Sequence, residues 1–356
     1  MAKLKRYAAP NRAAVNLSAT LTRDDVTFGD VTRAEFTAGD LALQQLGEIL
    51  RDSGYRFTTV TPITHTRVNA AAPLWARDLR DIFGWSRPFR QDILPAPMLE
   101  LMQRAQIIVP SGQGGRSTVR FSTVGDLTLM HSAFPTLADD AVFLGPDTYR
   151  FCALIKNVLK NSQNFASLET AAENTAVFRA CDLGCGSGAA AIAIAQYHPR
   201  AEVIAVDINA NALRFTRINA ALAKAENIAP CHSNLLKAVA GNFDLIVANP
   251  PYLVDPELRT YRHGGDQLGA ELSLAMLDAA LPRLKRGGTF VLYTGVAMPD
   301  GGDDPLLRTV QQRLEKADMR WRYEEIDPDV FGEEVGHGAY RDIERIAAIA
   351  LSVTRL

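Results

Sequence analysis

The hydrophobic pattern of the first 135 residues predicts helices followed by a hairpin. Apolar residues recur at helical intervals in three stretches, and two short stretches of strand character follow them. The helical stretches are 40–54, 74–83 and 97–105, and the strand-like ones are 117–122 and 127–130. A glycine-rich run, Ser111 to Gly115, predicts a turn before the strands. We therefore expect a small N-terminal α+β domain, similar to a winged helix, over residues 1–135.

A different pattern begins near Phe178, where strands and helices alternate. The expected strands are 178–183, 202–206, 229–232, 243–248, 289–293, 320–326 and 343–353, and the expected helices are 189–197, 210–225 and 272–284. Strands that alternate with helices form parallel sheets covered on both faces, through right-handed crossovers. Residues 136–356 are therefore expected to be a doubly wound, Rossmann-like α/β domain, with an antiparallel terminal hairpin at the sheet edge.

Composition narrows the class of protein. The chain has 356 residues, 38 Lys and Arg against 40 Asp and Glu, and four cysteines. These values favour a globular protein in a reducing compartment over a nucleic-acid coat protein or a disulfide scaffold. The longest apolar run, Ala189 to Ala195, is too short for a membrane span, and the basic N-terminus lacks a signal-peptide core. We expect a cytoplasmic protein without membrane contact, whose first twenty residues form a poorly ordered arm.

The first candidate site is a glycine-rich loop between a strand and a helix. It reads Asp182-Leu-Gly184-Cys-Gly186-Ser-Gly188, and Asp207 ends the next strand nineteen residues later. Glycines let the chain turn sharply and let a ligand approach the backbone, and a carboxylate after the second strand can bind both ribose hydroxyls. Asp182 would repel a pyrophosphate but attract an ammonium group. The loop therefore favours S-adenosylmethionine over a dinucleotide.

Two residues extend this site toward an adenine ring. Ile208 can cover one face of the ring, and Asn234, after the third strand, can bind its edge. An alternative stays open for Asn234, because an asparagine there can also be a turn residue that caps the following segment.

The second candidate site is Asn249-Pro250-Pro251-Tyr252, which follows the buried-looking strand 243–248. Two prolines stiffen the chain and remove two N–H donors, so that bare carbonyl groups remain. The Asn249 side-chain oxygen and the Pro250 carbonyl could accept both hydrogens of a substrate NH2, and a planar group could stack on Tyr252. Such acceptors hold a delocalised nitrogen with its lone pair toward a methyl carbon, without a metal or a covalent intermediate. A simple strand-ending turn is the alternative.

Together these motifs resemble the class I S-adenosylmethionine-dependent methyltransferases of the Asn-Pro-Pro-Tyr group, over about residues 143–356. That group includes HemK-type protein-glutamine methyltransferases and adenine N6- and guanine N2-methyltransferases of nucleic acids. The segment 144–148 is similar to the group's upstream element that packs over the cofactor, which makes Thr148 a cofactor contact. The resemblance implies a cofactor site of Thr148, Asp182, Gly184, Gly186, Gly188, Asp207, Ile208, Asn234 and Asn249, and a catalytic site of Asn249, Pro250 and Tyr252.

The acceptor is expected to be a protein glutamine, as in a release factor or other translation factor. The Gly-rich stretch 263–269 resembles one in HemK-type enzymes, although its residue order is shifted. A base in RNA or DNA is the alternative, because residues 67–120 hold eight arginines, four acids and two tryptophans. Lys3, Lys5 and Arg6 would add to such a basic surface, and a solvated domain surface would account for the same residues.

Other features are given plainer interpretations. A cofactor-sensing or RNA-binding module without catalysis is a further alternative, against which the intact tetrapeptide argues. Cys181 and Cys185 are interpreted as packing residues, and no metal site is expected. His263 is retained as a minor substrate candidate. The segment 331–340 is interpreted as a hairpin connection, with closure over the substrate as the alternative.

Overall fold

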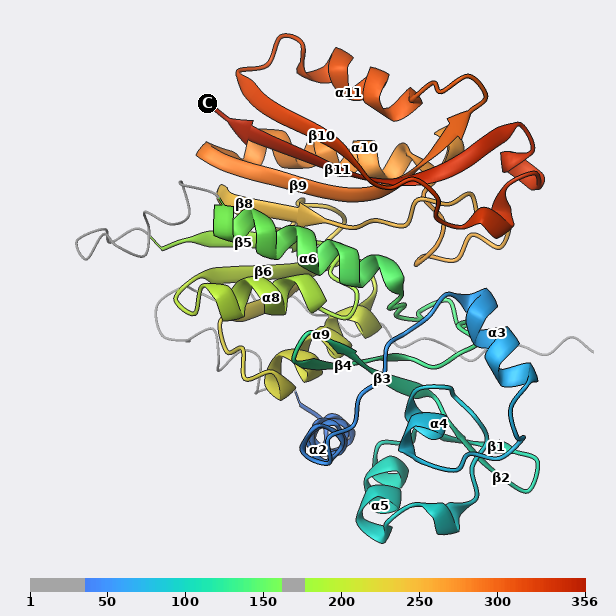
Figure 1. Ribbon diagram of the computed structural model, residues 1–356. Helices are drawn as coiled ribbons and strands as arrows, with labels where there is room; N and C mark the ends of the chain where they lie inside the picture. Colours follow the sequence, from blue (N-terminus) through green and yellow to red (C-terminus); the bar gives the residue numbers. More distant parts are fainter. Residues whose placement is uncertain (1–35, 162–176) are drawn as a thin grey trace, which may run out of the picture.

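A seven-stranded mixed sheet dominates the computed structural model, which describes residues 36–161 and 177–356 (Figure 1). The strand order is β10-β11-β9-β8-β5-β6-β7, with β5 to β9 parallel and β11 antiparallel to both of its neighbours. The strands are β5 (Arg179–Leu183), β6 (Glu202–Asp207), β7 (Ile228–His232), β8 (Phe243–Ala248), β9 (Leu284–Pro299), β10 (Met319–Asp327) and β11 (Ile343–Arg355). This confirms the Rossmann-like fold and its antiparallel edge.

Helices cover both faces of the sheet because successive strand residues face opposite cores. In β6, Val203 and Ala205 join one core while Ile204 and Val206 join the other. The first face carries α6 (Pro146–Asn161), α8 (Ala189–Tyr197) and α9 (Ala210–Leu222), and the second carries α10 (Glu271–Ala280) and α11 (Pro305–Leu314). Among the described residues, no helix combines the length and apolar character needed to cross a bilayer.

The N-terminal part lies against α9, below the sheet in Figure 1. It contains α2 (Ala38–Asp52), α3 (Pro62–Ala70), α4 (Leu79–Phe83), α5 (Ala96–Arg104) and the hairpins β1 (Ile108–Ser111)–β2 (Gly114–Ser117) and β3 (Val119–Val124)–β4 (Leu127–Ser132). Its core includes Phe215 and Ile218 of α9. Asn219 joins α9 to β4, since its amide donates to the Met130 carbonyl and accepts the Met130 N–H. The domain boundary at 135 and the winged-helix likeness stay predictions.

Short 3₁₀ helices connect the longer elements. They lie at Gln91–Ile93, Gln267–Gly269, Leu281–Arg283, Gly332–Glu334 and Gly338–Tyr340.

Several local expectations differ from the structure. The helix expected over 74–83 begins only at Leu79, because the Asp78 side chain caps it by accepting the Asp81 N–H at 2.8 Å. The glycine run holds a tighter turn than expected, with Gly114 and Gly115 already inside β2. A side chain at Gly114 would lie 2.3 Å from the Phe89 carbonyl oxygen, so close packing explains this glycine. The sequence pattern did not predict α3, α6 or α11.

The arginine-rich N-terminal segment is partly internal. Arg87 and Asp81 form a buried ion pair at 2.6 Å, with side chains 5% and 3% exposed. Arg120 is also buried, above the Phe57 ring. These two arginines are therefore unavailable to a nucleic acid, whereas most of the other six are exposed. The predicted contribution of Lys3, Lys5 and Arg6 lies outside the described residues, as does the N-terminal arm.

The Asp81–Arg87 pair gives a test of this packing. Asp81→Ala leaves the Arg87 guanidinium buried without its counter-charge, which costs about 3–5 kcal/mol of unfolding free energy. Arg77→Ala is the matched control, because Arg77 also contacts Asp81 but is 63% exposed, and it should cost about 1 kcal/mol or less. Urea unfolding followed by circular dichroism measures both, and equal losses would contradict a buried pair.

Candidate active site

A cavity of about 370 Å³ opens at the carboxyl ends of β5, β6 and β8. The chain reverses its winding direction between β5 and β8, which is where open α/β sheets bind ligands. Ten predicted site residues line this cavity: Thr148, Asp182, Gly184, Gly186, Asp207, Ile208, Asn234, Asn249, Pro250 and Tyr252. Gly188 lies outside the lining, at the start of α8, where a side chain would meet Thr216 at 2.8 Å.

The glycine loop is tied to both predicted carboxylates. Asp207 accepts the Gly186 N–H and the Asn209 N–H, each at 2.9 Å. Asp182 accepts the Ala191 N–H at 2.9 Å, inside α8. Burial raises the pKa of Asp182 to about 7, and the neighbouring Asp207 charge adds to this rise. Burial also raises the pKa of Asp207.

These carboxylates suit a cationic ligand. Among the described residues, neither Asp182 nor Asp207 forms an ion pair with a lysine or arginine. Gly186, at φ 52°, leaves open space where a side chain would project. A ligand carrying positive charge could therefore approach the loop backbone closely and lower the cost of keeping two buried carboxylates ionised.

The predicted adenine end of the site is more open. Ile208 is 53% exposed beside the cavity. The turn at Asn234 is closed by other groups, since the Asn234 carbonyl accepts the Lys237 N–H and the Ser233 hydroxyl accepts the Ala238 N–H. Within the described part of the chain, the Asn234 side chain makes no hydrogen bond, so it is available to a ligand. Thr148 reaches the cavity from the first turn of α6.

Asn249 and Pro250 follow directly after β8 and lie in the wall of the cavity. Asn249 is half-buried and lines the cavity with Pro250. Neither the Asn249 side chain nor the Pro250 carbonyl has a hydrogen-bond partner among residues 36–161 and 177–356. Two adjacent acceptors are thus free to bind both hydrogens of an NH2 group.

Tyr252 is held more tightly than its predicted stacking role requires. Its side chain is buried, and its hydroxyl donates to the Asp147 carboxylate at 2.7 Å. The Phe331 ring meets it edge to face at 5.7 Å, and a side chain at Gly295 would lie 2.1 Å from its ring. Stacking on a substrate stays a prediction, and the observed role of the ring is to pack within the wall of the cavity.

The glycine-rich stretch after the tetrapeptide supports it from outside the cavity. A side chain at Gly264 would lie 2.7 Å from the Tyr252 Cα, and one at Gly269 would lie 2.1 Å from the Tyr252 carbonyl oxygen. Gly269 also has φ 90°, which other residues rarely adopt. The sequence contained this signal as a run of glycines, but the contact with Tyr252 was not foreseen.

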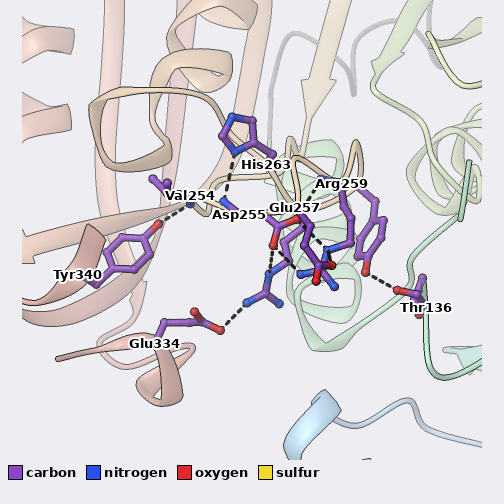
Figure 2. A network of polar contacts seen from close by, with 10 residues as sticks. Thr136, Val254, Asp255, Glu257, Arg259, His263, Glu334 and Tyr340 are labelled. Atoms are coloured by element: carbon purple, nitrogen blue, oxygen red, sulfur yellow. Dashed lines mark hydrogen bonds and ion pairs between the residues drawn. The ribbon is translucent and has the colours of Figure 1, made fainter. Parts of the chain in front are cut away.

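A polar network fixes the loop that borders the mouth of the cavity (Figure 2). Asp255, 2% exposed, binds the Arg259 guanidinium at 2.5 Å and lies 3.5 Å from that of Arg262. Arg262 also pairs with Glu334, and the Tyr340 hydroxyl accepts the Val254 N–H at 2.8 Å. The segment 331–340 is therefore bound to this loop, and Phe331 reaches the cavity itself.

The same network places His263 outside the cavity lining. Its Nδ1 accepts the Asp255 N–H at 3.2 Å, so the ring braces the loop. Sequence reasoning missed Arg259, Tyr261 and Arg262, which do line the cavity. Phe134 and Pro135, at the end of the predicted N-terminal domain, line the cavity too. These residues belong to no local motif. Tertiary packing brings them to the site, so the sequence alone did not reveal them.

Comparison with known proteins gives a match for the C-terminal part. Residues 166–323 match the family described as the methyltransferase small domain. The release factor glutamine methyltransferase of Xylella fastidiosa strain Temecula1 is 40% identical over 131 residues, 33% of this chain and 46% of that protein. The ribosomal protein uL3 glutamine methyltransferase of Xanthomonas campestris pv. campestris is 36% identical over 131 residues, 33% of this chain and 42% of that protein.

The chain thus spans less than half the length of these relatives. A solved tRNA m1G37 methyltransferase of M. jannaschii is similar with a TM-score of 0.42 and 17% identity, covering 67% of this chain and 57% of that one. A likeness at this level carries no argument about the substrate.

The contact between Gly269 and Tyr252 can be tested by stability. Gly269→Ala adds a methyl group at a residue with positive φ, close to the Tyr252 carbonyl oxygen. The clash should lower the free energy of unfolding by about 1–3 kcal/mol, in addition to the loss from backbone strain. Gly301→Ala is the matched control, since Gly301 has φ 89° but no atom within 4 Å of the added methyl. Thermal unfolding compares them, and equal destabilisation would show that Gly269 does not buttress the tetrapeptide.

Proposed function

We propose that this protein is an S-adenosylmethionine-dependent N-methyltransferase whose acceptor is a glutamine side-chain amide of a protein. The observation that carries the proposal is a pair of acceptors without a hydrogen-bond partner in the described part of the chain. They are the Asn249 side chain and the Pro250 carbonyl, in the cavity that also holds Asp182 and Asp207. The carboxylates suit a ligand that carries positive charge and hydroxyl groups. The two acceptors suit a ligand that carries a planar NH2 group. A methyl donor and an amide supply these two sets of groups.

The cofactor assignment uses residues of this chain at each end of the cavity. Asp182 and the backbone around Gly184 and Gly186 would hold the charged methionine part, and Asp207 the ribose. Ile208 and Asn234 would border the adenine, and Thr148 would cover the cofactor from α6. When bound, S-adenosylmethionine supplies an electrophilic methyl group on a sulfonium. Two observations support this fit: the open space over Gly186, and two carboxylates that form no ion pair with any described lysine or arginine.

The acceptor assignment follows from the chemistry of an amide. Its nitrogen is a poor nucleophile because the lone pair is delocalised into the carbonyl group. Asn249 Oδ1 and the Pro250 carbonyl accept its two N–H groups, which orients the nitrogen and stabilises the charge that develops on it. One of the two protons then passes to solvent. The stiffness of two successive prolines keeps the acceptors in place before the substrate arrives.

Two observations favour a protein amide over a nucleic-acid base. Relatives of this chain carry the names of glutamine methyltransferases that act on a release factor or a ribosomal protein. Burial of Arg87 and Arg120 reduces the arginine surface that suggested a nucleic acid, although most of the other six arginines are exposed. We therefore infer a protein substrate related to translation, selected by the N-terminal part of the chain.

Asn249→Ala separates catalysis from cofactor binding. Removal of one oriented acceptor should lower the rate of methyl transfer by about 100-fold or more, while the dissociation constant for S-adenosylmethionine changes little. Asp207→Ala should show the reverse pattern, with weaker cofactor binding. Isothermal titration measures binding, and a radiolabel assay measures transfer. Full transfer activity in the Asn249 variant would contradict the proposed mechanism.

A further inference from the structure

Asp147 joins three elements that meet at the cavity. It lies in the first turn of α6, and its side chain is only 13% exposed. One carboxylate oxygen accepts the Tyr252 hydroxyl at 2.7 Å, and the other accepts the Tyr293 hydroxyl at 2.8 Å. Arg150, 3.4 Å away, provides the ion pair. One carboxylate therefore connects the tetrapeptide loop, strand β9 and the helix that carries Thr148.

A carboxylate in this place is costly unless its oxygens are satisfied. Burial raises the pKa of Asp147, and the two phenol hydrogen bonds and Arg150 oppose that rise. A position at the start of α6 also favours negative charge, since unpaired N–H groups gather there. An apolar side chain would fill the same space without these requirements, so simple packing does not account for the aspartate.

We propose that Asp147 is a positioning residue for methyl transfer, which holds the Tyr252 hydroxyl and thereby fixes the Asn249–Pro250 acceptors against the cofactor. This inference rests on the proposed function. It adds a residue that does not itself bind the substrate NH2 group. Asp147 acts through Tyr252.

The packing around Tyr252 explains how one hydrogen bond could control the loop. Gly295 lies against the ring, the Phe331 ring meets it edge to face, and Gly269 lies close to the Tyr252 carbonyl group. The hydrogen bond to Asp147 adds a polar contact at the far end of the ring, where the hydroxyl lies. Tyr252 is two residues from Pro250, so its displacement moves the acceptor carbonyl.

The same anchor links the acceptor to the cofactor side of the cavity. Asp147 and Thr148 are consecutive residues of α6, and both line the cavity. A shift of α6 away from the cofactor would therefore also release the Tyr252 hydroxyl. The N-terminus of α6 therefore positions both the methyl donor, through Thr148, and the NH2 acceptors, through Asp147 and Tyr252.

Kinetics of Tyr252→Phe test the proposal directly. The variant keeps the ring between Gly295 and Phe331 and removes only the oxygen that Asp147 binds. We expect kcat to fall by about 10–100-fold because the acceptors lose their alignment, with the KM for S-adenosylmethionine within about twofold of the unaltered protein. Tyr323→Phe is the matched control, since it removes a similar phenol–carboxylate bond, of 2.7 Å to Asp304, remote from the cavity. It should leave kcat unchanged.

A double-mutant cycle shows whether Asp147 acts through Tyr252. Asp147→Ala alone should lower kcat as Tyr252→Phe does, and the double variant should be no slower than either single variant. If Asp147→Ala does not fold, Tyr252→Phe alone decides. Unchanged kcat in Tyr252→Phe, or additive losses in the double variant, would overturn the proposal. Failure of the proposed function would look different, because the unaltered protein would then transfer no methyl group to a protein.

Discussion

The structure depends on a stiff, hydrogen-bond-poor turn at the end of β8. Two successive prolines follow Asn249, and no described residue hydrogen-bonds the Asn249 side chain or the Pro250 carbonyl. Both residues line the cavity at the switch point of the sheet. A ligand in the cavity could supply donors to both acceptors. The surrounding structure packs closely against the turn.

That arrangement uses contacts from distant parts of the chain. Gly264 and Gly269, in the following loop, pack closely against the Tyr252 backbone. Gly295 packs against the Tyr252 ring, and Asp147 accepts a hydrogen bond from its hydroxyl. On the opposite wall, Asp182 and Asp207 are held by backbone N–H groups and leave open space over Gly186. In the proposed function, the first wall would receive an NH2 group and the second a cationic methyl donor.

The sequence predicted those parts of the site that local motifs encode. Asp207 and the glycine loop follow strands whose hydrophobic pattern is plain, and Asn249 follows another, so their meeting at one edge follows from the topology. The role of Asp147 could not be predicted, because its partners Tyr252 and Tyr293 are 105 and 146 residues away. Helix α6 was missed although its sequence carries a helical pattern, with buried Phe151, Cys152, Ile155 and Leu159 on one face. The expected helix at 74–83 was too long, because capping by Asp78 outweighs apolar spacing.

The central claim is that the acceptor is a protein amide, and a labelling experiment tests it most directly. The purified protein is incubated with radiolabelled S-adenosylmethionine and a lysate from cells that lack it, and parallel samples are treated with protease or nuclease. We predict that protease removes the label from the macromolecular fraction and that hydrolysis of the labelled protein yields N-methylglutamine. Loss of the label on nuclease treatment, or no label in either fraction, would contradict this claim.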